Sequence, residues 1–319
     1  MSHRPLTLFG LNRSIELAQR VAECLEIPLG LHEEREFEDG EHKARPLQTV
    51  RGHDVFVLHS LHGEPGASGN DKLCRLLFFC NALKDAGAAR VTAVTPYLCY
   101  ARKDRRTKPD DPITTRYIAA LFEAVGIDEV IAFEVHNVAA FENAFRCPTM
   151  HLESAPLLAA HLAPVLAREK IVVLSPDAGG AKRAESFRAA MEVELQRDVG
   201  NAIMEKFRSS GVVSGSLLAG DVRDRTVVIV DDMISTGGTL IRAAVACHRA
   251  GAARVIAAAA HGLFMDGAPE LFAAPELESV LVSNSMPPFR VGPDARAKLK
   301  IFDAGPAIAK AVIVCHQAI

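Results

Sequence analysis

Short apolar runs alternate along the chain with longer segments in which apolar and polar positions recur at helical spacing. The apolar runs that predict strands include Asp54–His59, Val91–Thr95, Val130–Phe133, Ile171–Leu174, Thr226–Val230 and Val255–Ala260. The segments that predict helices include Ser14–Leu25, Leu73–Ala86, Thr114–Ala124, Ser154–Ala167 and Gly238–Ala250. Strands that are apolar at nearly every position are buried on both faces. The pattern therefore predicts an α/β fold whose mostly parallel sheets are flanked by helices.

A short sequence is nearly repeated in the two halves of the chain. Lys84–Val91 reads KDAGAARV and His248–Val255 reads HRAGAARV. In each copy a helix is expected to end at a glycine, Gly87 or Gly251, before the next strand begins. So short an identity can arise by chance, but each copy also lies downstream of a strand and a loop. We favour a duplication that produced two similar halves.

Length, composition and charge narrow the class of protein. The 319 residues suit two domains, which we place at 1–150 and 151–319. A net charge of −3 gives no electrostatic footprint for nucleic acid or an anionic membrane. The sequence shows neither an apolar run long enough for a membrane span nor the apolar core of a signal peptide. Its seven scattered cysteines fit reduced core thiols. We expect a cytoplasmic protein that binds neither nucleic acid nor membrane.

The strongest chemical signal is Val227–Leu240, which reads VVIVDDMISTGGTL. An apolar strand leads into two acids, Asp231 and Asp232, followed by small residues and a helix. The small residues are Ser235, Thr236, Gly237, Gly238 and Thr239. Such a loop can hold a phosphate with backbone N–H groups, hydroxyls and the positive end of the helix. The acids would repel phosphate, so they suit the hydroxyls of a ribose. An ordinary Asx-type turn is the alternative.

Other segments carry residues that could bind a ligand or act in catalysis, although each also has an ordinary structural explanation. PYLCYARKDRR follows one strand and can be a solvated basic loop. EVHN follows another, and its lone histidine can be structural, since Mg²⁺ prefers oxygen ligands. SPDAGG can form a common Pro-Asp turn. AIMEKFR, before the glycine-rich segment, can carry its charges for solubility.

Together and in this order, these segments resemble those of the ribose-phosphate pyrophosphokinase family, whose members make phosphoribosyl pyrophosphate from ribose 5-phosphate and ATP. The FEDGE segment near the amino terminus is also similar to the family's pattern. The resemblance extends over residues of about 6 to 316. It implies two tandem type I phosphoribosyltransferase-like domains, Mg²⁺ as cofactor, and a homo-oligomer that is dimer-based and possibly hexameric.

The resemblance also implies roles for individual residues. The catalytic cations would be Lys206 and Arg208, on a mobile loop. The ATP site would comprise Phe37, Asp39, Glu41, Arg102, Lys103, Asp104 and His136. The segment with the first three would reach the adenine of a neighbouring subunit. Ribose 5-phosphate would contact Asp177, Gly179, Gly180, Asp231, Asp232, Ser235, Thr236, Gly237, Gly238 and Thr239. The metal would lie at His136 and Asp177.

Several positions depart from the family pattern. Lys103 replaces a glutamine, Glu134 replaces an aspartate, and Phe207 interrupts a basic run. The segment His59–Leu73 also differs, so the resemblance carries no expectation about regulation. Two alternatives remain open. One is a non-catalytic, regulatory relative of the synthetase; the other is a phosphoribosyltransferase that consumes phosphoribosyl pyrophosphate.

Overall fold

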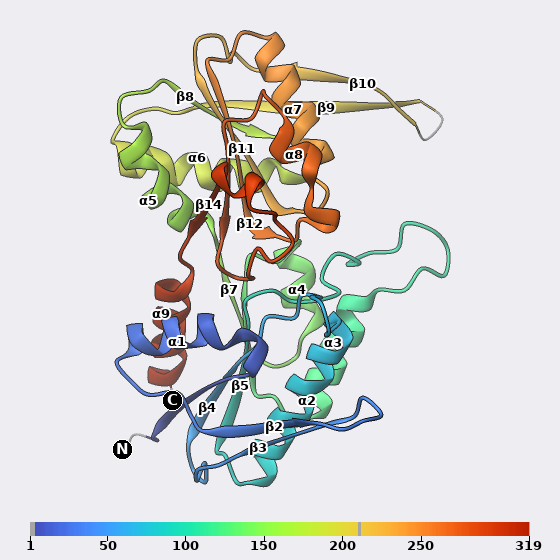
Figure 1. Ribbon diagram of the computed structural model, residues 1–319, viewed down its shortest axis with the longest axis vertical. Helices are drawn as coiled ribbons and strands as arrows, with labels where there is room; N and C mark the ends of the chain where they lie inside the picture. The colour runs from blue at the N-terminus through green and yellow to red at the C-terminus, as the bar shows by residue number, and fades with distance from the viewer. Residues whose placement is uncertain (1–3, 210–211, 319) are drawn as a thin grey trace. The chain divides into compact units, whose positions relative to one another are not determined.

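The computed structural model describes residues 4–209 and 212–318, with side chains throughout these ranges except 205–216. The chain forms two compact units (Figure 1). The first contains Met1–Leu152 and Ala304–Ile319, and the second contains Glu153–Asp303. Each unit has a central, mostly parallel sheet with helices against it, so the predicted fold class is confirmed.

The first unit is built on a parallel sheet with the strand order β1-β4-β5-β6-β7. Its strands are β1 (Leu6–Gly10), β4 (Asp54–Leu58), β5 (Arg90–Thr95), β6 (Glu129–Phe133) and β7 (Thr149–Leu152). A separate antiparallel hairpin consists of β2 (His32–Glu36) and β3 (His42–Pro46). The helices are α1 (Ile15–Leu25), α2 (Gly69–Asp85), α3 (Thr114–Ala124), α4 (Val138–Ala144) and α9 (Gly305–Gln317), with the short 3-10 turn η1 (Asn12–Ser14) before α1.

The second unit has the strand order β10-β9-β8-β11-β12-β13-β14, in which only the β9–β10 pair is antiparallel. Its strands are β8 (Ile171–Ser175), β9 (Gly200–Ser209), β10 (Val212–Ala219), β11 (Thr226–Ile234), β12 (Arg254–Gly262), β13 (Ser279–Ser283) and β14 (Leu299–Phe302). Its helices are α5 (Ala155–Leu166), α6 (Ala181–Leu195), α7 (Gly238–Arg249) and α8 (Pro269–Ala273), with 3-10 turns η2 (Ala178–Gly180), η3 (Met265–Gly267) and η4 (Asp294–Ala297).

The order of elements in the first unit recurs in the second. In each unit a strand (β1, β8) leads through a 3-10 turn into a helix, and an antiparallel hairpin then precedes a second strand (β4, β11). Helix α2 or α7 follows and ends before a glycine with positive φ, Gly87 at +89° or Gly251 at +90°. Glycine has no Cβ and adopts this conformation easily. The repeated sequence therefore lies at equivalent places in the two units, where α2 and α7 end.

The helix that trails each sheet packs in the other unit. Helix α5 follows β7 and packs on α6, while α9 follows β14 and packs on α1. Within the first unit, Arg90 donates to the carbonyl of Cys315 in α9 at 2.7 Å, and His316 contacts Asp54 at 2.7 Å. The compact units therefore differ from the predicted ranges 1–150 and 151–319 in the assignment of α9.

Strand β11 is longer than the pattern predicted. Its pairing with β12 continues through Met233 with His261 and Ile234 with Gly262. Asp231 and Asp232 therefore lie within the last part of this strand and do not follow it. The prediction stopped at Val230 because the apolar run stops there, whereas backbone pairing with a neighbouring strand tolerates polar side chains.

Across residues 4–209 and 212–318, no helix combines the length and the apolar character needed to cross a membrane.

Candidate functional site

The loop between β11 and α7 has the geometry of an anion cradle. Gly237 precedes the helix with a φ of +82°, and a Cβ on it would lie 2.8 Å from the Cβ of Leu271. Only glycine fits this position without strain. The N–H groups of the first turn of α7 have no acceptors within the helix, so they are available to an anion.

A neighbouring backbone segment braces this loop. The N–H groups of Leu263 and Phe264 both donate to the carbonyl of Ile234, at 2.9 and 3.1 Å. The N–H of Met265 donates to the carbonyl of Ser235 at 3.0 Å. These bonds fix the start of the loop. The first turn of α7 is therefore held in place before any ligand binds.

Asp231 and Asp232 form a carboxylate pair beside the loop. The N–H of Asp232 donates to Oδ1 of Asp231 at 2.9 Å, and Arg183 Nη1 lies 3.9 Å from Oδ1 of each acid. Burial, together with the hydrogen bond and charge of Asp232, raises the pKa of Asp231 to about 7, and Arg183 opposes this shift. Two adjacent carboxylates suit hydroxyl donors better than phosphate, because phosphate carries the same charge.

Asp177 forms a turn at the end of β8, the strand next to β11. Its Oδ1 accepts hydrogen bonds from the N–H groups of Gly179 at 3.1 Å and Gly180 at 3.3 Å. A Cβ on Gly180 would lie 2.9 Å from Oγ of Ser175. The local geometry is thus that of the ordinary Pro-Asp turn. Since β8 and β11 are parallel neighbours, the turn and the carboxylate pair lie at the same edge of the sheet.

One polar residue near the cradle was missed in the sequence. Arg242 Nη2 donates to Oγ1 of Thr239 at 3.1 Å, in the first turn of α7. A cation at the amino end of a helix is unfavourable for the helix dipole, so stability of the helix does not explain it. A basic residue three positions after Thr239 is the signal that would have identified it.

In the first unit, the loops after β5 and β6 come together. Asn137 Nδ2 donates to Oδ2 of Asp104 at 2.6 Å, which joins the basic loop to the segment that carries the exposed His136. Lys103 Nζ lies 2.6 Å from Oδ2 of Asp111 in its own loop. The hydrogen bond from Lys103 holds the pKa of the Asp111 carboxyl well below its usual range. Of the predicted ATP residues, Asp104 and His136 are thus placed on adjoining loops, and Lys103 stabilises its own loop.

The backbone at the start of the basic loop is strained. Tyr100 has a φ of +60°, which is rare for a bulky residue. Its carbonyl accepts hydrogen bonds from Oγ1 of Thr114 and of Thr115, both at 3.2 Å, and its hydroxyl bonds to Asn70. Strained backbone of this kind persists where surrounding contacts fix it, and it concentrates at functional sites.

The FEDGE segment forms the tip of the β2–β3 hairpin. The N–H of Phe37 donates to the carbonyl of Glu41 at 2.8 Å, and Oδ1 of Asp39 accepts from the N–H of Glu41 at 3.1 Å. The Phe37 ring is 37% exposed, with the Arg35 guanidinium 5.1 Å from its centroid. Within the first unit, this tip lies away from the basic loop 101–113 (Figure 1). One chain therefore does not bring its own FEDGE segment to its own basic loop.

The two predicted catalytic cations lie on β9. Lys206 pairs with Ser216 and Arg208 with Val213 across the β9–β10 hairpin. Their side chains lie outside the described residues. The backbone register places both on one strand, two residues apart.

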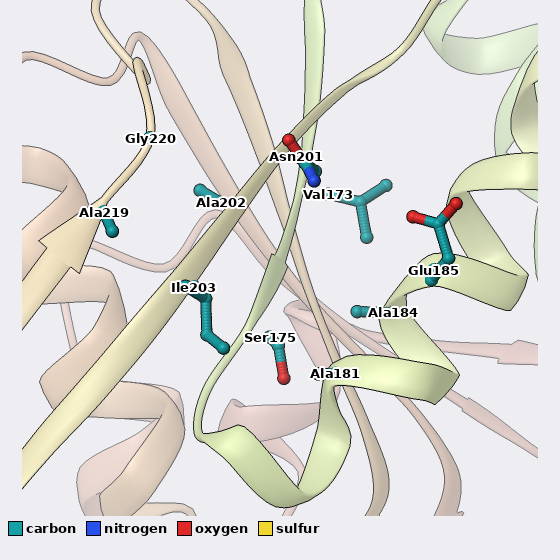
Figure 2. Close-up of a pocket in the computed structure, with 10 residues that line it drawn as sticks. All are labelled: Val173, Ser175, Ala181, Ala184, Glu185, Asn201, Ala202, Ile203, Ala219 and Gly220. Carbon is teal, nitrogen blue, oxygen red and sulfur yellow. The ribbon is translucent and has the colours of Figure 1, made fainter.

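A pocket of about 370 Å³ lies between the base of this hairpin, β8 and α6 (Figure 2). Its walls are mostly aliphatic, with Ser175, Glu185 and Asn201 as polar members. The carboxylate of Glu185 is bound by Arg188 at 2.7 Å. None of the predicted site residues lines this pocket. Alternating polar and apolar positions at the start of β9 predict only a two-faced strand, and nothing in the sequence marks a cavity there.

The family resemblance implies Mg²⁺ as the cofactor. In the ranges 4–209 and 212–318, no cluster of three or more His, Cys, Asp or Glu side chains is arranged to hold a metal. Mg²⁺ is usually bound through one or two protein carboxylates and the phosphates of a substrate. Asp177 offers one such carboxylate at the carboxyl edge of the second unit's sheet, and His136 is exposed in the first unit.

Comparisons with known families match both halves of the chain. Residues 6–126 match the N-terminal domain of ribose phosphate pyrophosphokinase, and residues 151–270 match the phosphoribosyl transferase domain. The ribose-phosphate pyrophosphokinase of Clostridium tetani is 34% identical, over 97% of this chain and 93% of its own. That of Haemophilus ducreyi is 37% identical, over 88% of this chain and 87% of its own.

A solved structure agrees over the whole length. The crystal structure of phosphoribosylpyrophosphate synthetase from Mycobacterium smegmatis matches with a TM-score of 0.88 and 31% identity, and covers 99% of this chain and 100% of its own. The fold and the sequence relatives therefore agree, and the chain belongs to the ribose-phosphate pyrophosphokinase family of enzymes.

Proposed function

We propose that this chain transfers the diphosphoryl group of MgATP to the C1 hydroxyl of ribose 5-phosphate, giving phosphoribosyl pyrophosphate and AMP. The observation that carries the proposal is the phosphate cradle of α7 with the carboxylate pair Asp231 and Asp232 beside it, in a chain of this family. A phosphate and ribose hydroxyls a few ångströms apart would match these two features. We also keep a cytoplasmic location as a prediction.

Ribose 5-phosphate is proposed to bind at the carboxyl edge of the second unit's sheet. The N–H groups at the start of α7 and the hydroxyls of Ser235, Thr236 and Thr239 hold the 5-phosphate, where Gly237 and Gly238 allow close approach. Asp231 and Asp232 accept hydrogen bonds from the 2- and 3-hydroxyls. Asp177, Gly179 and Gly180, on the neighbouring strand end, border the sugar.

ATP is proposed to bind at the loops after β5 and β6, with Arg102, Lys103, Asp104 and His136. Bound Mg²⁺ would neutralise the triphosphate and orient it, with His136 and Asp177 as its protein ligands. Phe37, Asp39 and Glu41 would serve the nucleotide of a neighbouring subunit. This is supported by the separation of the hairpin tip from the basic loop within one chain (Figure 1). The proposal therefore includes a homo-oligomer built from dimers, with a hexamer as one such assembly.

The chemistry is proposed to be an in-line displacement. The C1 hydroxyl oxygen bonds to the β-phosphorus, and the bond from that phosphorus to the α,β-bridging oxygen breaks. The leaving AMP keeps the bonding electron pair, and the hydroxyl proton passes to solvent. Lys206 and Arg208 stabilise the charge that develops on the transferred group. Positioning and such cations account for most catalysis of phosphoryl transfer.

The test is AMP formation from ATP and Mg²⁺ with and without ribose 5-phosphate. The wild type should release AMP only with the sugar phosphate. Lys206→Ala should lower turnover by roughly 10²–10³-fold, the usual cost of losing one electrostatic contact to a transition state. Lys310→Ala, at an exposed position of α9, is the matched control and should retain full activity.

The same assay separates the alternatives. A folded protein that binds ribose 5-phosphate without sugar-dependent AMP, also with other nucleotide donors, would indicate the regulatory relative. Release of diphosphate from phosphoribosyl pyrophosphate with a nucleobase would indicate a phosphoribosyltransferase.

A further inference from the structure

The first unit contains a counterpart of the phosphate loop. Because the two units repeat the same order of elements, β4 corresponds to β11 and α2 to α7. Both strands occupy the same place, directly after the first strand of the parallel order, β1-β4 in one unit and β8-β11 in the other. The segment 59–68, which joins β4 to α2, is therefore equivalent to the loop that we assign to the 5-phosphate.

This segment carries a carboxylate where its counterpart has an anion cradle. Glu64 Oε1 accepts from Arg13 Nη1 at 3.0 Å. Glu64 Oε2 lies 3.1 Å from Lys72 Nζ and 3.2 Å from His62 Nε2. Lys72 belongs to the first turn of α2 and Arg13 to the turn before α1, so three separate segments converge on one carboxylate. We call Arg13, His62, Glu64 and Lys72 the Glu64 cluster.

Two members of the Glu64 cluster, His62 and Lys72, are almost completely buried. Lys72 is 0% exposed and His62 1% exposed. A buried ammonium group is strongly unfavourable unless a charge of opposite sign compensates it. Burial alone would raise the pKa of Glu64, but hydrogen bonds from His62 and Lys72 lower it to about 2. Glu64 is thus an anion at every ordinary pH, and the site requires one.

A second observation also indicates an oxygen-rich ligand. His59 is fully buried at the end of β4, and burial holds the pKa of its ring well below the ordinary value. Its Nδ1 bonds to Oγ of Ser14 at 3.0 Å, while its Nε2 has no hydrogen-bond partner. Lys72, His62 and Glu64 are the charged neighbours that act most strongly on this ring. A buried polar atom without a partner needs a physical explanation, and a ligand atom bound beside the cation cluster would supply one.

The backbone of the loop around Glu64 directs the Glu64 side chain toward the cations of the cluster. The N–H of Glu64 donates to the carbonyl of Ala67 at 2.8 Å, and the N–H of Ala67 returns a bond at 3.1 Å. Arg13 also donates to the carbonyls of Pro65 at 3.2 Å and Gly66 at 3.3 Å. The loop therefore folds over Arg13, and its own side chain reaches the cations.

We propose that the carboxylate of Glu64 occupies an oxyanion site formed by Arg13, His62 and Lys72, the first unit's equivalent of the phosphate loop. The site takes a phosphate-class oxyanion, and in this chain the protein supplies that anion itself. Free sulfate or orthophosphate is excluded while Glu64 is in place, and removal of the carboxylate opens the site to it. The proposal does not depend on the transferase activity.

The experiment is thermal unfolding of the full chain in increasing sodium sulfate or sodium phosphate, with sodium chloride at equal ionic strength as reference. Glu64→Ala should lower the unfolding midpoint, and sulfate should restore it in a saturable way by roughly 2–4 °C beyond chloride. Glu64→Gln, which keeps the shape of the side chain, should show the same response if the alanine variant folds poorly. Acetate should restore part of the midpoint, because it replaces the missing carboxylate.

Two controls decide the interpretation. Glu23→Ala removes an exposed carboxylate paired with Arg20 at 3.1 Å and should show no sulfate response beyond chloride. Glu64→Gln combined with Lys72→Met should lose the response of Glu64→Gln. The proposal is overturned if both single Glu64 variants respond to sulfate no more than Glu23→Ala does. It is also overturned if the double variant keeps the response, or if the wild type shows the same saturable effect.

Discussion

Single residues determine the geometry of the proposed sugar-phosphate site. Gly237 is needed because its φ is positive and because Leu271 packs closely against it. The positive charge of Arg183 lies near both Asp231 and Asp232, and it offsets the repulsion between their two carboxylates. The sequence predicts a site at the loop and the two acids because small residues and paired acids after an apolar run are rare, and that assignment stays a prediction. It did not identify Arg242 or the partner of Asp104, because contacts between segments depend on the fold.

Replacing Gly237 should damage both stability and binding. A Cβ there would lie 2.8 Å from Leu271 in a backbone conformation that side chains avoid. We expect Gly237→Ala to lower the free energy of unfolding by about 2–4 kcal/mol, from strain and overpacking together. Urea denaturation would measure this. Gly292→Ala is the control, since no atom lies within 4 Å of its added Cβ. Equal losses in both variants would contradict the account.

The pH dependence of sugar binding should report Asp231. Its pKa is raised to about 7, so the ionised carboxylate, which is the stronger acceptor for hydroxyl groups, forms as pH rises through that value. The KM for ribose 5-phosphate should therefore fall several-fold between about pH 6 and pH 8. Asp231→Asn should abolish this dependence. A wild-type profile that is flat near pH 7 would contradict the assignment.

The stability of the fold should change with pH in the opposite direction to sugar binding: it should fall as pH rises through the pKa of Asp231. An acid whose pKa is raised in the folded state binds a proton more tightly there than in the unfolded chain. The contribution of Asp231 to stability is complete below its unfolded pKa of 3.8 and is lost as pH rises to about 7. Asp231→Asn should therefore stabilise the protein more at pH 8 than at low pH, as urea midpoints at the two pH values would show.

At the scale of elements, the periodic pattern predicted those strands and helices in which burial requires apolar residues at regular positions. Helix Thr114–Ala124 was predicted with its observed bounds, and the predicted strand at Asp54 continues one residue past the observed β4. The β2–β3 hairpin was missed because His32–Glu36 and His42–Pro46 are mostly charged, and their pairing depends on the backbone and on α2. The place of α9 in the first unit was not predicted, because a helical pattern does not specify its packing partner.

The attachment of α9 should depend on Arg90. Its guanidinium binds Asp54, which is 0% exposed, at 2.8 Å, Glu129 at 3.3 Å and the carbonyl of Cys315 at 2.7 Å. Arg90→Met leaves the buried Asp54 without its main counter-ion, and we expect a loss of about 3 kcal/mol. Arg45→Met removes a more exposed pair with Glu33 and should cost less than about 1 kcal/mol. Hydrogen exchange in α9 should rise only in the first variant.

At the scale of the whole molecule, our proposal is that the enzyme combines more than one chain. The FEDGE tip and the basic loop lie apart within one first unit, so a complete nucleotide site would combine segments of two subunits (Figure 1).

Mixing experiments should reveal this sharing. Glu41→Ala and Lys206→Ala chains should each be nearly inactive alone, because each lacks one part of every site. After unfolding and refolding together, random dimers would regain roughly a quarter of wild-type activity, since half are mixed and one of their two sites is complete. Refolding each variant alone is the control. No recovery from a mixture that forms oligomers would contradict a site shared between subunits.

The central claim concerns which phosphorus of ATP is attacked, and ³¹P NMR of the reaction mixture tests it most directly. The account predicts that AMP appears together with a new pair of coupled diphosphate resonances, attached to C1 of ribose 5-phosphate, in equal amounts. Appearance of ADP with ribose 1,5-bisphosphate would mean transfer of a single phosphoryl group and would contradict the account. So would the absence of any sugar-dependent product from protein that binds both substrates.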